Sequence, residues 1–134
     1  MDFSQINYWA VLVAALVTMG IGAAWYSQAL FGKIWMRANG FDGNEPGGNM
    51  ARTMIIAFIL SLIMSFNLAA FLADPGTNVK WGMTAGFLAG FGWVALSIAV
   101  VSLFERRSFA YMAVNGGYWV VSFIAMGAIL GAWR

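Results

Sequence analysis

The chain has 134 residues, of which 62% are hydrophobic and only 9% are charged. Soluble domains carry about 25% charged residues, so this composition excludes a water-soluble fold, and the small net charge of +2 gives no reason to expect nucleic acid as a partner. Cysteine and histidine are absent, which excludes disulfides, thiolate nucleophiles and metal sites built on those side chains. We therefore expect no cofactor and no metal, and a lipid bilayer around the chain.

Four apolar stretches cover most of the sequence. Each is about as long as the roughly 20 residues that a helix needs to cross a bilayer, and apart from Lys80 they contain no acidic or basic side chain. Backbone groups cannot stay unpaired in hydrocarbon, and the alternating polarity of a barrel is missing, so the stretches predict helices. We expect an all-α, polytopic integral membrane protein with one domain, residues 1–134. Its four transmembrane helices are expected at residues 6–26, 54–73, 79–104 and 109–133.

Polar and turn-forming residues separate these spans. Asp74-Pro75-Gly76 forces a turn after the second span, because proline cannot continue a helix and disfavours helical geometry in the residue before it. Short polar side chains also precede each span, where they can accept an unpaired backbone N–H. These expected N-caps are Ser4, Asn49, Asn78 and Ser108.

The basic residues predict an orientation in the membrane. Five of them lie in the loops that follow the first and third spans, namely Lys33, Arg37, Arg52, Arg106 and Arg107. Only Lys80 and Arg134 belong to the opposite side. Because cytoplasmic loops carry an excess of Lys and Arg, we expect a multi-pass protein of the inner (plasma) membrane with both termini on the non-cytoplasmic side.

A short amphipathic helix is expected after the first span. At helical spacing Leu30, Phe31, Ile34 and Trp35 share one face, and Lys33 and Arg37 share another. One interpretation is a membrane anchor whose cations meet lipid phosphates and whose aromatic rings lie at the headgroup level. Its membrane-interface residues would be Trp25, Tyr26, Lys33, Trp35 and Arg37. In the other interpretation, Tyr26, Lys33 and Trp35 line a vestibule for an anionic or aromatic ligand.

This segment also carries a family resemblance. Trp25-Tyr26-Ser27, then Phe31-Gly32-Lys33 and Trp35, together with Glu105-Arg106 followed by Asn115-Gly116-Gly117-Tyr118, resemble the bacterial domain-of-unknown-function family numbered 1761. The resemblance spans most of the chain and implies a small multi-helix membrane fold with no established activity. The family has proline after Trp-Tyr-Ser where this chain has Gln28, so whether the first helix breaks here or runs on stays open.

Glycines form a packing face on the third span. Gly82, Gly86 and Gly90 recur at intervals of four residues, a spacing that lets two membrane helices approach closely. Gly127 and Gly131 form a second, smaller face of this kind on the fourth span. The sequence leaves open whether the first face packs within one chain or between two copies. Because four short helices enclose little interior, we expect a homo-oligomer, with a dimer favoured.

Polar side chains predict a layer inside the membrane. With a rise of about 1.5 Å per residue, they fall roughly 9–12 Å from the cytoplasmic helix ends. The layer consists of Thr18, Ser61, Ser97 and Asn115, flanked by the aromatic residues Trp93 and Tyr118. It is either a set of hydrogen bonds that holds the helices together or a substrate-binding site for a small neutral or aromatic solute.

The placement of the acidic residues argues against an enzyme. Hydrolysis, phosphoryl transfer and metal chemistry need acids, His or Cys held close together, and every carboxylate side chain lies outside the spans. Coupled exchangers also place an ionisable group at membrane depth. Two hypotheses remain: an oligomeric channel, facilitator or binding protein for a neutral or aromatic solute, and an accessory or structural subunit that acts through helix contacts.

Overall fold

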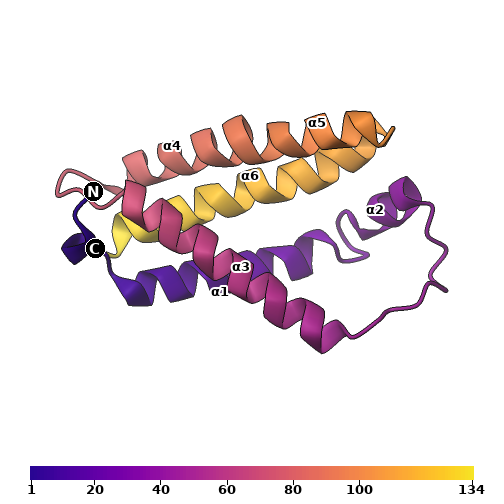
Figure 1. The fold of residues 1–134 in the computed structure, drawn as a ribbon, viewed down its shortest axis with the longest axis horizontal. Helices are drawn as coiled ribbons and strands as arrows, with labels where there is room; N and C mark the ends of the chain where they lie inside the picture. Colours follow the sequence, from indigo (N-terminus) through magenta and orange to yellow (C-terminus); the bar gives the residue numbers. More distant parts are fainter.

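The computed structural model describes all residues, 1–134, and every regular element in it is helical (Figure 1). The third span is one continuous rod whose middle segment is π-helical, with hydrogen bonds from residue i to i+5 instead of i+4. In chain order the elements are η1 (Phe3–Gln5), α1 (Tyr8–Trp25), α2 (Gly32–Asn39), α3 (Met50–Phe71), α4 (Val79–Ala89), the π-helical η2 (Gly90–Ala95), α5 (Leu96–Phe104) and α6 (Phe109–Ala132).

Four helical segments are long and apolar enough to cross a membrane: α1, α3, the rod α4–η2–α5, and α6. The predicted spans are therefore present, and the protein is an all-helical, multi-pass membrane protein with one additional short helix. α3 begins at Met50, four residues before the predicted start, because Asn49 caps it by accepting the N–H of Arg52. Asn78 and Ser108 cap α4 and α6 as predicted.

Three of the spans form a layer, and the fourth crosses it. α6 is the central helix, with α1 along one side and the rod α4–η2–α5 along the other (Figure 1). α3 lies across one face of this layer and packs mainly on α1. Its crossing contact includes a hydrogen bond of 2.9 Å from the hydroxyl of Ser65 to the carbonyl oxygen of Val11, where both residues are buried.

The two glycine faces meet each other inside the chain. A methyl group on Gly82 would overlap the carbonyl oxygen of Gly127, and one on Gly127 would overlap that of Gly82. Gly90 lies against Phe123, whose Cβ would be 2.8 Å from an added methyl carbon. α4 and α6 therefore touch backbone to backbone, so the glycine face is used for packing within one chain.

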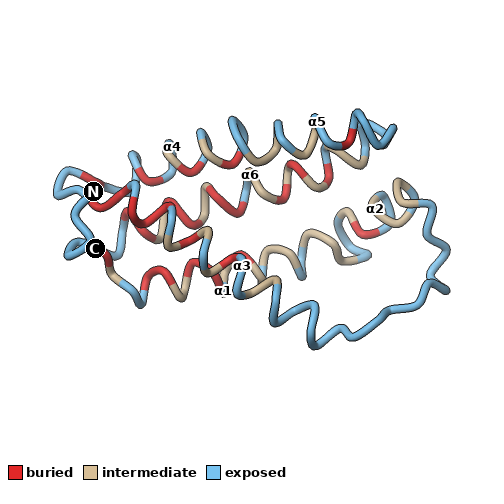
Figure 2. Tube along the Cα trace, in the orientation of Figure 1, coloured by how far each residue is buried: buried red, intermediate tan, exposed pale blue.

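The two ends of the molecule differ in burial. We call the end with both termini and the α3–α4 turn the closed end, and the end with α2, the loop at 40–49 and the α5–α6 turn the open end. The buried apolar core occupies the closed-end halves of α1, α3 and α6 (Figure 2). In contrast, none of residues 50–60, the first half of α3, is buried.

Hydrogen bonds tie the closed end together. Arg134 donates from Nη1 to the carbonyl oxygen of Leu72 (2.9 Å) and from Nη2 to that of Asp74 (2.6 Å), which satisfies carbonyls at the end of α3. The backbone N–H of Asp2 donates to the carbonyl oxygen of Ala73 (3.1 Å). The N-cap of α1 is Asn7 instead of the expected Ser4, because Ser4 belongs to the preceding short helix η1.

The first helix does break after Trp-Tyr-Ser. α1 ends at Trp25, and the N–H of Phe31 then donates to the carbonyl oxygen of Trp25 at 2.9 Å, which closes a tight loop. Gly32 is buried against this loop, and a side chain there would overlap the carbonyl groups of Tyr26 and Ser27. A proline at position 28 is thus not needed for the break, because the small residue at position 32 permits it.

Candidate functional site

Trp25 anchors the loop after α1 to the central helix. Its indole N–H donates to the carbonyl oxygen of Val114 at 2.9 Å, across 89 residues of sequence. Gly117 makes room for the ring, since a methyl carbon there would lie 3.0 Å from the indole. The ring of Phe31 packs on the same indole, with ring centres 4.5 Å apart. Trp25, predicted as an interface residue, therefore also fixes α2 against α6.

Tyr26 is the centre of a polar and aromatic cluster. Its hydroxyl donates to Oδ1 of Asn115 at 2.7 Å. Its ring lies edge-on to the rings of Trp35 (5.8 Å between centres) and Tyr118 (5.5 Å). Through Tyr26, the loop after α1 thus joins α2 to two successive turns of α6.

Tyr118 connects this cluster to the middle of α1. It is buried, and its hydroxyl donates to the carbonyl oxygen of Thr18 at 2.9 Å. Gly22 leaves space for it, because an added methyl carbon would be 3.1 Å from the phenol oxygen. The Thr18 hydroxyl itself donates to the carbonyl oxygen of Ala14, one turn earlier in the same helix. Thr18, Asn115 and Tyr118, three of the six residues named for the predicted polar layer, are thereby brought together.

A cavity of about 300 Å³ opens beside the two tyrosines. It lies between the last two turns of α1, the first two turns of α3 and the middle of α6, in the open-end half of the molecule. Its lining contains no charged group and combines two phenols with small or flexible apolar side chains. The lining residues are Met19, Gly22, Ala23, Tyr26, Met54, Ala57 and Tyr118.

The hydrogen bonds of the two tyrosines determine which further hydrogen bonds a ligand in this cavity can form. Both phenol hydroxyls donate their proton within the chain, and each phenol oxygen keeps the capacity to accept one further hydrogen bond. Asn115 does not line the cavity and acts on it only by accepting the proton of the Tyr26 hydroxyl. The Tyr26–Tyr118 cavity therefore suits a neutral molecule that carries at least one hydrogen-bond donor.

Ser97 and Trp93 do not join this group, although helical spacing placed them with Gly86 and Gly90. Both are exposed, Trp93 on the side that faces α3, and the Ser97 hydroxyl donates to the carbonyl oxygen of Trp93 in its own helix. For Ser97 the cause is η2, because a π turn holds more residues than an α turn and rotates the following residues. The spacing argument assumed an uninterrupted α-helix, and this assumption is wrong.

Ser61 is buried on α3, one turn before Ser65, but it does not line the cavity. Tyr26 does line it, although the sequence assigned this residue to the membrane interface or to a vestibule with Lys33 and Trp35, and not to the polar layer. A signal for Tyr26 was present, since Thr18, Gly22 and Tyr26 follow each other at intervals of four on one helical face. The partner of that face, on α6, could not be read from the spacing.

The cations of α2 stay at the surface. Lys33 and Arg37 are exposed, as are the neighbouring apolar side chains of Leu30 and Ile34. Trp35 is half-buried because it packs between the rings of Tyr26 and Phe41. This arrangement suits an amphipathic helix at the membrane surface, whose aromatic side leads toward the Tyr26–Tyr118 cavity.

Comparison with known proteins gives one match. A family model described as a protein of unknown function (DUF1761) matches residues 9–131, nearly the whole chain. No curated protein and no solved structure matches the chain.

Proposed function

Because the chain belongs to the family of proteins of unknown function DUF1761, we propose its function from the structure alone: it is a membrane-embedded binding protein for a small, neutral molecule. The Tyr26–Tyr118 cavity is the proposed binding site. The observation that carries this proposal is that two tyrosines, whose hydroxyls are held by hydrogen bonds, line an uncharged cavity between three helices long enough to span a membrane. The molecule we infer is largely apolar, with a hydrogen-bond donor directed at a phenol oxygen.

The lining favours binding over catalysis. A reaction would need a nucleophile, an acid–base group or a metal close to the substrate, and the cavity offers methionine, alanine, glycine and tyrosine only. Its volume of about 300 Å³ lies at the lower limit of typical small-molecule sites, which are roughly 300–1,000 Å³. We therefore propose a non-enzymatic protein with a ligand about the size of a substituted benzene ring.

The location of the cavity favours a binding protein over an open channel. The cavity lies in the open-end half, whereas the closed end is filled by apolar core and tied by Arg134. We propose the inner (plasma) membrane as the location and assign the open end to the cytoplasm, because the basic residues concentrate there. A ligand would then enter from the cytoplasmic half of the bilayer, between α1 and α3.

This function can be tested with a matched pair of fluorinated probes. 4-Fluorophenol carries one hydrogen-bond donor, and 4-fluorotoluene has a similar size and none. We expect the ¹⁹F NMR signal of 4-fluorophenol to show saturable binding to the protein in nanodiscs, and that of 4-fluorotoluene to show only partitioning into lipid. Replacing Tyr118→Phe or Tyr26→Phe removes an acceptor oxygen and should weaken the binding of 4-fluorophenol about three- to tenfold.

Tyr8→Phe is the control for these variants, because Tyr8 is 60% exposed and lies at the opposite end of α1. It should bind 4-fluorophenol as the parent protein does. Equal behaviour of the two probes, or unchanged binding of 4-fluorophenol to both cavity variants, would refute the proposed site.

A second candidate function, an accessory subunit that acts through helix contacts, is favoured by the unpacked first half of α3. Since the chain contains no cysteine, a cysteine introduced at one position reports only that position. In native membranes, Ile59→Cys should form cross-linked dimers or adducts faster than Val101→Cys, a similarly exposed site on α5. Equal rates at the two positions would argue against this function and against a homo-oligomer that assembles through α3.

A further inference from the structure

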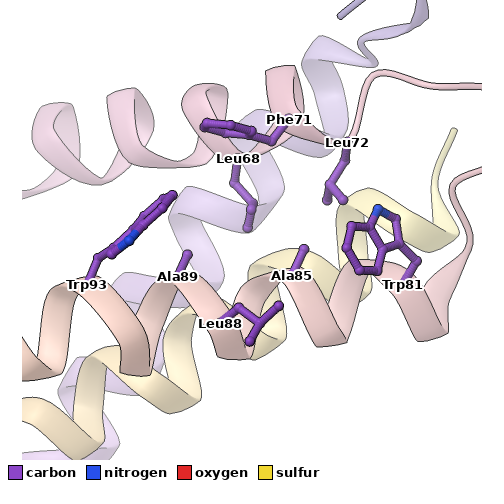
Figure 3. A pocket seen from close by; sticks show the side chains of 8 residues that line it. All are labelled: Leu68, Phe71, Leu72, Trp81, Ala85, Leu88, Ala89 and Trp93. Atoms are coloured by element: carbon purple, nitrogen blue, oxygen red, sulfur yellow. The ribbon is translucent and has the colours of Figure 1, made fainter.

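A second cavity lies on the other side of α3, in the closed-end half. It is a groove between the last turns of α3 and the rod α4–η2, and Figure 3 shows it from close by. Its main chamber measures about 380 Å³, and a smaller one of about 180 Å³ continues it toward Phe123. The two chambers share Leu68, Phe71, Ala89 and Trp93. This α3–α4 groove shares no residue with the Tyr26–Tyr118 cavity.

Small side chains create the groove. α4 turns its glycines toward α6, so that Ala85 and Ala89 form the side that faces α3. These methyl groups are too short to reach α3, although the two helices are consecutive in the chain. Leu68 and Leu72 extend from α3 into the space without filling it (Figure 3).

Two tryptophans frame the groove. The indoles of Trp81 and Trp93 both point from the rod toward α3, with the two alanines between them (Figure 3). Ala85, Ala89 and Trp93 follow each other at intervals of four residues and therefore share one face of the rod. Trp93 remains 65% exposed, and its ring lies 6.3 Å from that of Phe71, at 55°.

One polar group lies in the wall of the groove. Asn67 lines the smaller chamber, is exposed, and makes no hydrogen bond with its side chain inside the protein. α3 continues for four more residues after it, so the amide lies about 6 Å inside the closed end of this helix. An amide without a partner in hydrocarbon costs several kcal/mol. The occupant of the groove should therefore offer a hydrogen-bonding group to Asn67.

We propose that the α3–α4 groove binds a flat, lipid-soluble ring compound that carries a carbonyl group. The carbonyl accepts a hydrogen bond from the amide of Asn67, and the ring stacks on the exposed face of Trp93, an arrangement that aromatic side chains favour. A lipid acyl chain fills the apolar space equally well but leaves the amide unpaired and gains nothing from the two indoles. Entry is lateral from the bilayer, since the groove opens between two membrane-spanning helices.

The seven tryptophans allow a direct test. With 5-fluorotryptophan incorporated and the protein in nanodiscs, single Trp→Phe variants assign the ¹⁹F resonances. The probe is menadione, a two-ring compound with two carbonyl groups, and 2-methylnaphthalene is its analogue without them. We expect menadione to shift the resonances of Trp93 and Trp81 saturably, with those of Trp9 and Trp133 unchanged, and 2-methylnaphthalene to bind about three- to tenfold more weakly.

Two variants of the groove and one control variant of the other cavity test the proposal further. Asn67→Leu should weaken menadione binding to the level of 2-methylnaphthalene, and Ala85→Leu should abolish it by filling the groove. Tyr118→Phe, which alters the other cavity, should leave it unchanged. Unsaturable shifts of all tryptophans, equal binding of the two probes, or unchanged binding to Asn67→Leu would each overturn the proposal. So would Trp93 resonances that depend on the protein-to-lipid ratio without a probe, since this would indicate that a second copy covers the groove.

Discussion

The closed and open ends of the molecule differ in how firmly α3 is attached to the other helices. At the closed end, a backbone hydrogen bond joins Asp2 to Ala73, and the guanidinium of Arg134 donates to the carbonyls that follow α3, so three segments distant in sequence are held together. At the open end α1 breaks, α2 turns aside, and the first half of α3 has no buried residue. α3 is thus held at one end and free at the other. The Tyr26–Tyr118 cavity, at the free end, can therefore change its width without disturbing the core.

The largest loss of stability is expected when a side chain forces α4 away from α6. We expect Gly82→Leu to destabilise the protein by more than about 3 kcal/mol, because its side chain would overlap the backbone of Gly127 and neither backbone can yield. Gly20→Ala is the matched control, since open space surrounds Gly20. Thermal unfolding in detergent measures both. A folded, fully stable Gly82→Leu variant would show that the contact of α4 with α6 is not as close as described.

A smaller effect comes from the core at the closed end. Leu72 is fully buried, and Leu72→Ala should cost about 2–4 kcal/mol through lost contacts and an unfilled cavity. Ile55→Ala, at the open end, should cost less than about 0.5 kcal/mol, because its side chain is 59% exposed and faces lipid in both forms. Comparable losses in detergent unfolding for the two variants would mean that the open half of α3 is packed after all.

The hydrogen bonds of Arg134 are expected to matter less than the core. Arg134→Gln removes two charge-assisted bonds at a partly exposed site, so we expect a loss of about 1 kcal/mol. Hydrogen exchange should quicken for the amides of residues 72–78 and stay unchanged for the start of α3. Arg52→Gln, at the start of α3 in the open end, is the control. Faster exchange throughout the molecule would contradict a role confined to the closed end.

The smallest expected effect concerns the crossing point of α3 and α1. Ser65→Ala removes the hydroxyl that donates to Val11, and we expect a loss of about 0.5–1 kcal/mol, because such bonds contribute little in membranes. Spin labels at Met50 should then report a wider range of distances to α6, whereas labels at Phe71 should not. A variant with an unchanged distribution at Met50 would show that this bond does not restrain α3.

Much of the architecture could be predicted because it depends on composition and local sequence. The spans follow from apolar length, and the capping roles of Asn49, Asn78 and Ser108 follow from residue type and position. The site was only partly predictable, since its decisive contacts join residues far apart in sequence. The hydroxyl of Tyr26 meets Asn115 across 89 residues, and no periodicity within either helix indicates that pairing.

The π segment explains the largest error of prediction. Gly90 and Gly92 relax the local backbone, but a six-residue π turn leaves no signal in the hydrophobic pattern, because all its residues are apolar or glycine. The assignment of Ser97 to the face of Gly86 and Gly90 was counted across this segment and is therefore wrong. The glycine faces could be predicted, because the small size of Gly82, Gly127 and Gly131 indicates that another helix comes close. Their size does not indicate which helix is the partner.

Because α3 is attached at one end only, a small tilt of this helix displaces its free end by several ångströms. Ser65, at the crossing point, is 15 residues from Met50, a distance of about 22 Å along the helix axis. A tilt of about 10° about Ser65 would displace Met50 by about 4 Å, and bilayers of different thickness change the tilt of membrane helices. Since Met54 and Ala57 line the Tyr26–Tyr118 cavity from this arm, the width of the cavity would follow the thickness of the surrounding membrane.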